Sequence, residues 1–170
     1  MPSMTSDSGD PIIVSNTTPI SELAKIGRLN LLLDLYGRIF IPHEVFNEVT
    51  TGSHPADQTL PQIDWIEVRA IANSQKVIAL HTHTKLGLGE CAAITLAEEL
   101  GASRLLIDDL AARREALSRN IPIIGTVGII LLAKKLGLIS NVKEILDDLI
   151  AHGARMGRQL YLDALNVAGE

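Results

Sequence analysis

The sequence contains little cysteine, few aromatic residues and no long apolar run. Cys91 is the single cysteine among 170 residues, which excludes an internal disulfide and favours a reducing compartment. Aromatic residues make up 3% of the chain and hydrophobic residues 46%, enough apolar material for one domain with a core. No run reaches the roughly 18 apolar residues that a membrane helix needs. The longest candidate, residues 121–133, is interrupted by Pro122, Gly125 and Gly128, so a strand, a turn and a buried helix are expected there.

An excess of positive charge is absent as well. The formal net charge is −5 at pH 7, which disfavours a protein that coats nucleic acid through a global basic field. Residues 1–11 are polar and lack the basic and apolar stretches of a signal peptide. We therefore expect a flexible tail over residues 1–11, a single domain over residues 12–170, and a cytoplasmic protein with no membrane partner.

Short runs rich in Ile and Val alternate along the chain with longer helical patterns. This alternation is typical of an α/β fold, in which a mostly parallel sheet is covered by helices on both faces. The expected strands are residues 11–14, 38–41, 65–69, 105–107 and 121–124. The expected helices are residues 19–27, 28–37, 42–49, 89–100, 110–119, 126–136, 142–151 and 159–168.

Acidic and amide side chains stand where expected strands end or helices begin. Asn16 follows the first strand, Glu48 lies in the helix after the second, and Glu90 opens a later helix. Asp108 and Asp109 follow the fourth strand. Because ligand sites of parallel sheets form beyond the carboxyl ends of the strands, we expect these side chains to meet at one edge.

Each carboxylate also has a purely structural interpretation. Glu90 suits the first turn of a helix, where the helix dipole favours an acid. Either Asp108 or Asp109, but not both, can be the N-cap of the helix that follows. Glu44 and Glu48 can belong to a solvated face. Several acids at one edge nevertheless repel one another unless a cation lies among them, and oxygen ligands suit Mg²⁺ or Mn²⁺.

Five motifs occur in a fixed order. They are N-T-x-P at residues 16–19, I-P-x-x-V-x-x-E at 41–48, G-x-G-E-x-x-A-I-x-L-A at 87–97, L-L-I-D-D-x-x-A-R at 105–113 and I-x-G-T-x-G at 123–128. This order resembles the PIN-domain superfamily, and more closely its prokaryotic branch of predicted nucleic-acid-binding, VapC-like proteins. The resemblance implies a three-layer α/β/α fold and cleavage of RNA with Mg²⁺ or Mn²⁺. Members are commonly dimeric toxins silenced by a small antitoxin protein.

The resemblance also assigns roles to individual residues. The expected catalytic residues are Asn16, Glu48, Glu90, Asp108 and Asp109. The expected metal ligands are Glu90, Asp109, Asp108 and Asn16. The expected substrate-binding residues are Thr17, Arg113 and Thr126. Asn16 departs from the pattern, because active nucleases usually carry Asp there. Its carbonyl oxygen can bind a cation but brings no charge, so a lower metal affinity is expected.

The predicted function is therefore hydrolysis of RNA phosphodiester bonds by a metal-dependent endoribonuclease, the toxin of a toxin–antitoxin pair. Asn16 favours the alternative, a catalytically weak or silent PIN-like module that binds RNA or a protein partner, so enzyme activity stays open at this point. The sequence does not rank the basic side chains that would contact the RNA backbone. They are Arg104, Arg113, Arg114 and Arg119; Lys134, Lys135 and Lys143; and Arg155 and Arg158.

The apolar content of residues 123–133 exceeds what one small core needs. A surface for a homodimer, or a groove for an antitoxin, is expected near the C-terminal helices.

Other chemistries are less well supported. Residues 87–92 fit the dinucleotide fingerprint G-x-G-x-x-A, but no apolar strand precedes them and Glu90 would repel a pyrophosphate. An aspartyl phosphotransferase needs Asp where Asn16 stands.

The histidines match no usual metal motif. His81 and His83 alternate as on an extended segment, and their spacing to Cys91 is not that of a known transition-metal site. His43 and His54 are expected at the surface or in loops.

Overall fold

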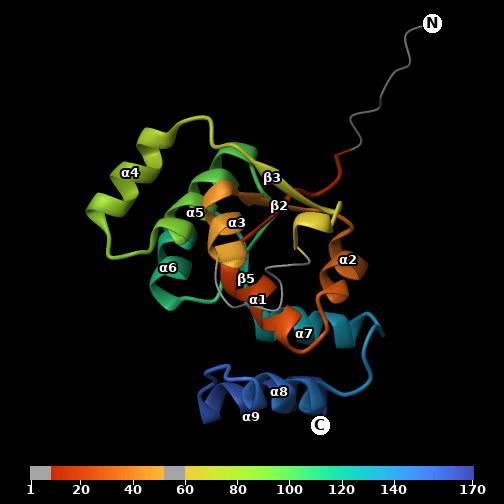
Figure 1. The fold of residues 1–170 in the computed structure, drawn as a ribbon. Coiled ribbons are helices and arrows are strands. Elements are labelled where there is room, and N and C mark those ends of the chain that lie inside the picture. Colours follow the sequence, from red (N-terminus) through yellow and green to blue (C-terminus); the bar gives the residue numbers. More distant parts are fainter. Residues whose placement is uncertain (1–8, 52–59) are drawn as a thin grey trace, which may run out of the picture.

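A parallel β-sheet forms the centre of the molecule (Figure 1). The computed structural model describes residues 9–51 and 60–170, and within them five strands pair in the order β3-β2-β1-β4-β5, all parallel. The strands are β1 (Ile13–Ser15), β2 (Ile39–Pro42), β3 (Ile66–Arg69), β4 (Arg104–Leu106) and β5 (Ile123–Ile124). The chain moves from β1 to β2 and β3 on one side, and to β4 and β5 on the other. The sheet therefore has its topological switch point between β1 and β4.

Helices cover the sheet in the three-layer α/β/α arrangement expected from the sequence. They are α1 (Thr17–Lys25), α2 (Asn30–Tyr36), α3 (His43–Thr51), α4 (Ser74–His83), α5 (Leu88–Leu100), α6 (Leu110–Ser118), α7 (Thr126–Lys135), α8 (Val142–Ala151) and α9 (Arg158–Ala168). Helix α5 packs on β1, β2 and β4, with α3, α4 and α6 beside it. Helices α1 and α7 pack together, and α8 and α9 lie beyond α7 at the end where the chain terminates (Figure 1).

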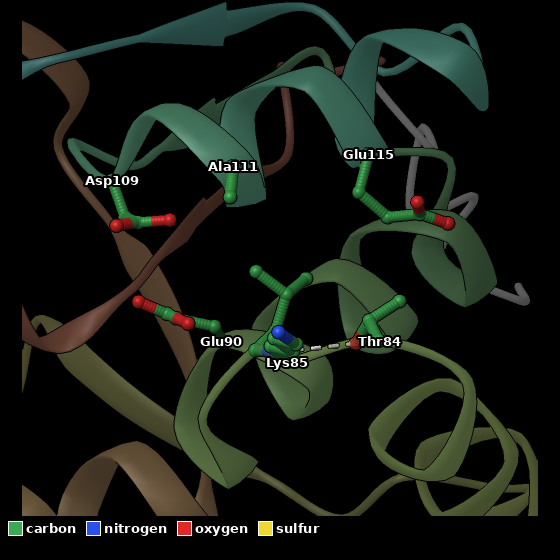
Figure 2. A pocket seen from close by; sticks show the side chains of 7 residues that line it. Thr84, Lys85, Glu90, Asp109, Ala111 and Glu115 are labelled. Carbon is green, nitrogen blue, oxygen red and sulfur yellow. Dashed lines mark hydrogen bonds between the residues drawn. The ribbon is translucent and has the colours of Figure 1, made fainter.

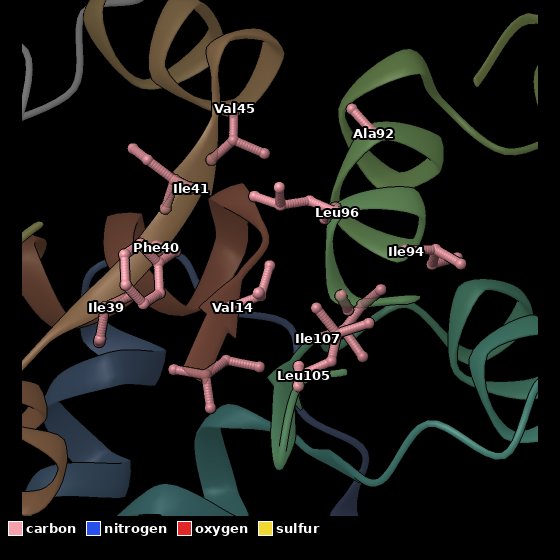
Figure 3. Packing of buried hydrophobic residues seen from close by; sticks show 14 of the residues in the cluster. Val14, Ile39, Phe40, Ile41, Val45, Ala92, Ile94, Leu96, Leu105 and Ile107 are labelled. Carbon is pink, nitrogen blue, oxygen red and sulfur yellow. The ribbon is translucent and has the colours of Figure 1, made fainter. Parts of the chain in front are cut away.

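The main core is aliphatic and lies between the sheet and α5 (Figure 3). Val14, Ile41 and Leu105 come from three neighbouring strands and are fully buried. Leu96 points from α5 toward these strands (Figure 3). Burying one such side chain stabilises the fold by about 1.5–3 kcal/mol. This packing holds α5 firmly on the sheet, and with it Glu90 at the start of the helix.

A second, smaller cluster joins α7, α8 and α9. Ile130 and Ala133 of α7 and Leu146 of α8 are fully buried and pack in this cluster with Ala164 of α9. The apolar residues 123–133 are thus partly buried within the chain itself. Among the described residues, no helix has both the length and the apolar character to span a bilayer.

Most expected elements are confirmed, with their ends displaced by at most two residues. Helix α8 begins and ends where the sequence pattern predicts. Pro42 was expected in the first turn of a helix, but it is the last residue of β2 and pairs with Arg69 of β3. The helix begins one residue later, at His43, which is exposed as expected.

The extended segment expected around His81 and His83 is wrong, because both residues lie in α4. The side chain of Asn73 accepts a hydrogen bond from Gln75 N at 3.2 Å and caps this helix. The sequence pattern of α4 indicates a helix only weakly, because this helix buries a narrow stripe that consists of Val77 and Leu80. His54 and residues 1–8 of the expected tail lie outside the described residues.

Candidate active site

The expected site residues gather at the carboxyl edge of the sheet, around its switch point. Asn16 follows β1 directly, and its backbone N–H donates to Leu106 O of β4 at 2.9 Å. Asp108 and Asp109 follow β4 two and three residues later. Because β1 and β4 are neighbours, the residues that follow them share one edge. Helix α5 brings Glu90 to the same place.

Glu90 and Asp109 point toward one another across an open cavity (Figure 2). One carboxylate oxygen of each is engaged locally. Glu90 Oε2 accepts from Gly87 N at 2.9 Å, which is the glutamate half of a capping box, since Gly87 has no side chain to return the bond. Asp109 is the N-cap of α6, and its Oδ2 accepts from Ala112 N at 2.9 Å. Within the described residues, Glu90 Oε1 and Asp109 Oδ1 have no hydrogen-bond donor.

The surroundings of Glu90 disfavour its charged form. Burial raises the pKa of Glu90 above its ordinary value, while the bond from Gly87 N opposes this shift. The negative charges of Asp109 and Glu48 raise the pKa of Glu90 further. A cation between Glu90 and Asp109 would remove the repulsion between the two carboxylates.

Glu48 has both oxygens engaged. Thr17 Oγ1 donates to Oε2 at 2.6 Å, and Gly89 N donates to Oε1 at 3.1 Å. The carboxylate lies so close over Gly89 that a Cβ atom there would overlap it. Glu48 therefore ties α3 to the first residue of α1 and to the start of α5, where it also interacts favourably with the helix dipole.

Asp108 is engaged in the same way. Its Oδ1 accepts from Thr126 N at 2.7 Å, and its Oδ2 accepts from Thr126 Oγ1 at 2.6 Å. Thr126 is buried at the start of α7. A Cβ atom on Gly125 would lie 2.7 Å from Asp108 Oδ1 and 2.6 Å from Arg113 Nη1. Gly125 thus makes room for Asp108 and for the guanidinium of Arg113.

Unlike Glu48 and Asp108, Asn16 has a side-chain oxygen that makes no hydrogen bond within the described residues. Its side chain is 3% exposed, and its Oδ1 is buried without a hydrogen-bond partner in the described part of the chain. It is the N-cap of α1, yet its side chain makes no capping bond. A buried carbonyl oxygen without a partner is costly, so this atom is available to a ligand.

The donor chemistry of the edge fits a hard divalent cation. Glu90, Asp109 and Asn16 each present an oxygen that makes no hydrogen bond within the described residues, and oxygen ligands suit Mg²⁺ or Mn²⁺. Among the described residues, no group of three or more His, Cys, Asp and Glu side chains could hold a metal. A cation bound to Glu90 and Asp109 would therefore need further oxygens from Asn16, water or substrate.

The structure separates residues that the sequence treated alike. It brings Glu90 and Asp109 together, and it engages Glu48 and Asp108 in hydrogen bonds to Thr17, Gly89 and Thr126. Two glycines were overlooked, Gly89 and Gly125. The motifs could have indicated both glycines, because Gly89 directly precedes Glu90 and Gly125 directly precedes Thr126.

Histidine and cysteine side chains of residues 9–51 and 60–170 form no metal centre at this edge. His81 Nδ1 is 3.0 Å from Leu86 O, and Cys91 is fully buried in the core.

The fold and the edge site define a class, α/β proteins with an acidic site at the switch point of a parallel sheet. Over residues 12–170 the chain matches the family model described as DUF3368: PIN domain. The protein therefore belongs to the PIN-domain family, and the resemblance to the PIN-domain superfamily is confirmed, whereas the VapC-like branch stays a prediction. Members of this family are generally nucleases that depend on divalent metal, so membership supports a role on nucleic acid.

Among solved structures, the fold is similar to that of a PilT N-terminus domain protein from the hyperthermophilic archaeon Sulfolobus solfataricus P2. The TM-score is 0.51 and the sequence identity 16%, over 86% of this chain and 100% of that chain. At this identity the likeness shows the fold alone. No curated protein matches the chain.

Proposed function

We propose that the protein is a metal-dependent endoribonuclease whose active site is built around Glu90 and Asp109. One observation carries the proposal: the two carboxylates face each other, and each keeps one oxygen without a hydrogen-bond donor in the described residues. Structural carboxylates are normally paired or fully hydrogen-bonded, and like charges in contact cost stability. Such an arrangement is expected where function requires it.

In this proposal, Glu90, Asp109 and Asn16 hold the Mg²⁺ or Mn²⁺ ion. The bound ion supplies an acidified water and offsets the negative charge that develops at the phosphate. The capping bonds at Gly87 and Ala112 orient the two carboxylates, so little conformational freedom is lost when a ligand binds between them.

The hydrogen-bonded acids take a supporting role. Asp108 was expected as a metal ligand, but both of its oxygens already accept from Thr126, so we assign it to positioning. The hydrogen bonds of Asp108, which directly precedes Asp109, join this part of the chain to the start of α7. Glu48 likewise links Thr17, the neighbour of Asn16, to Gly89, the neighbour of Glu90. Arg113 remains a candidate for substrate contact, since its guanidinium lies against Gly125 beside Asp108.

Three finer parts of the proposal rest on the sequence resemblance. They are the choice of RNA as substrate, the homodimeric state, and the role as a toxin restrained by a small antitoxin. Family membership supports the coarser statement, a role on nucleic acid.

The test is cleavage of a labelled single-stranded RNA pool with Mg²⁺, with Mn²⁺ and with EDTA, by the wild type and by Asp109→Asn. Asn is as good an N-cap as Asp, so the substitution removes charge while α6 keeps its first turn. We expect metal-dependent cleavage by the wild type and a loss of about 100-fold or more in the variant, beyond the 10–100-fold typical of supporting residues.

Asp163→Asn is the matched control, because Asp163 is exposed on α9 at the far end of the molecule. It should cleave at the wild-type rate. Wild-type activity in Asp109→Asn would remove Asp109 from the site.

A second candidate function follows from Asn16. Without the charge of an aspartate at this position, the chain would bind RNA or a protein partner and not cleave. RNA binding in EDTA, combined with no cleavage in either metal, would establish this alternative.

A further inference from the structure

The cavity between Glu90 and Asp109 extends past the acid pair. It has a volume of about 370 Å³. The loop between α4 and α5 contributes Thr84, Lys85 and Leu86 to its wall, and α6 contributes Ala111 and Glu115 (Figure 2). A chain lying in this cavity would pass the acid pair and continue between α6 and the loop.

The cavity contains one cation, Lys85, beside three carboxylates. Glu115 is paired, since its Oε1 accepts from Arg119 Nε at 2.9 Å, and the same guanidinium also donates to Glu98 Oε2 at 3.1 Å. The other two carboxylates are Glu90 and Asp109. Lys85 is exposed and takes part in none of the ion pairs formed by the described residues. Its charge is therefore available to an anion that enters the cavity.

The loop that carries Lys85 is held on both sides. Thr84 Oγ1 donates to Leu80 O at 2.7 Å and accepts from Leu86 N at 3.3 Å. His81 Nδ1 lies 3.0 Å from Leu86 O, and the side chain of Leu86 is buried in the core. One residue further, Gly87 N bonds to Glu90. The backbone of Lys85 is thus fixed relative to the acid pair, although its ammonium group reaches solvent.

We propose that Lys85 binds a backbone phosphate of the RNA strand next to the phosphate that a metal ion between Glu90 and Asp109 would bind. The inference rests on the proposed function and deepens it, because it places the substrate strand along the loop between α4 and α5. It also explains how an acidic protein attracts an RNA strand: one fixed cation stands beside the carboxylates that the metal neutralises. Since a lysine contact to phosphate carries no base information, Lys85 contributes affinity and not sequence preference.

The experiment measures binding of a fluorescein-labelled single-stranded RNA in EDTA by anisotropy, at several salt concentrations. The proteins are the wild type, Lys85→Met, Lys85→Arg and a control, Lys76→Met. Met keeps most of the apolar stem of lysine, and Lys76 is an exposed lysine in the first turn of α4. We expect Lys85→Met to weaken binding about five-fold and to reduce the slope of log K against log salt by about 0.7, the share of one phosphate contact on a single strand.

Lys85→Arg should restore both quantities, and Lys76→Met should leave them unchanged. In the cleavage assay with metal, Lys85→Met should raise KM and leave kcat within about two-fold, as expected for a contact that acts on binding. An unchanged salt slope in Lys85→Met, or a fall in kcat with KM unchanged, would overturn the proposal.

Failure of the proposed function gives a different pattern. If the salt slope of RNA binding depends on Lys85 but the wild type cleaves with neither metal, the proposed nuclease activity is wrong and the phosphate contact is still supported. If the wild type binds no RNA in EDTA and cleaves with neither metal, both proposals are overturned.

Discussion

Glu90 and Glu170 are two glutamates at helix starts, and their surroundings act on them in opposite directions. Glu170 lies at the start of α8, where its carboxylate accepts from Val142 N at 2.8 Å and Lys143 N at 3.0 Å. Lys134 Nζ donates to the same carboxylate at 2.9 Å. These bonds lower the pKa of Glu170 to about 2. Glu90 has one such bond and two neighbouring carboxylates, and its pKa is raised.

The comparison distinguishes a structural carboxylate from a functional one. The partners of Glu170 come from α7 and α8 and fasten the end of the chain to them. The neighbours of Glu90 leave its charge without compensation inside the protein. Proximity to a helix N-terminus is common to both, so the helix dipole alone does not reveal which acid serves a ligand.

Among substitutions that test this comparison, Glu90→Gln has the largest expected effect. Gln keeps an oxygen for Gly87 N and removes the charge, so we expect a loss of RNA cleavage of about 100-fold or more. The Glu90→Gln variant should nevertheless be more stable than the wild type. The pKa of Glu90 is raised in the native protein, so native Glu90 costs stability once the pH exceeds its folded pKa. Thermal unfolding at pH 7 should show that the Tm of the variant is higher than that of the wild type by about 2 °C. A lower Tm in the variant would contradict the conclusion that the charge of Glu90 destabilises the native state.

Asn16→Asp sharpens the comparison by adding a further carboxylate to the site of Glu90. The side chain is 3% exposed, so without metal the new charge should lower the unfolding free energy by about 1–3 kcal/mol. Mg²⁺ or Mn²⁺ should then raise Tm more than in the wild type, because the stabilisation of the native state by a ligand grows with the logarithm of ligand concentration over Kd.

Calorimetry with and without metal measures both effects of Asn16→Asp. Asn30→Asp is the control, since Asn30 is exposed at the first residue of α2. An equal metal-induced shift in all three proteins would exclude Asn16 from the metal shell.

The smallest effect is expected from Glu170→Gln. Because the pKa of Glu170 is lowered to about 2, its carboxylate stabilises the native state above its ordinary pKa, and the contribution disappears as the pH falls toward 2. The variant should therefore be less stable than the wild type at pH 7 and approach it in strong acid. Urea unfolding at a series of pH values tests this, and RNA cleavage at pH 7 should be unchanged. A stability difference that persists at pH 2 would contradict the role of the charge.

Local patterns predicted most of this fold. Helix α8 was placed without error, because its apolar residues recur at helical spacing and Asn141 caps its first turn at Glu144 N. Helix α4 was missed because its narrow buried stripe gives little periodicity. The N-cap alternatives for Asp108 and Asp109 could be stated from the sequence, but not decided, since the two residues are adjacent and have the same side chain.

The sequence by itself determined that Asn16, Asp108 and Asp109 each follow a strand and that Glu90 opens a helix, because these positions are read from local patterns. The order of the strands, which brings these residues to one edge, is a long-range outcome of packing. Only the tertiary structure decided which carboxylate oxygens remain without donors. Asp108 meets Thr126 across 18 residues of chain and Glu48 meets Gly89 across 41. Hydrogen bonds of this kind depend on donors that arrive when the sheet and helices pack, and no local pattern specifies them.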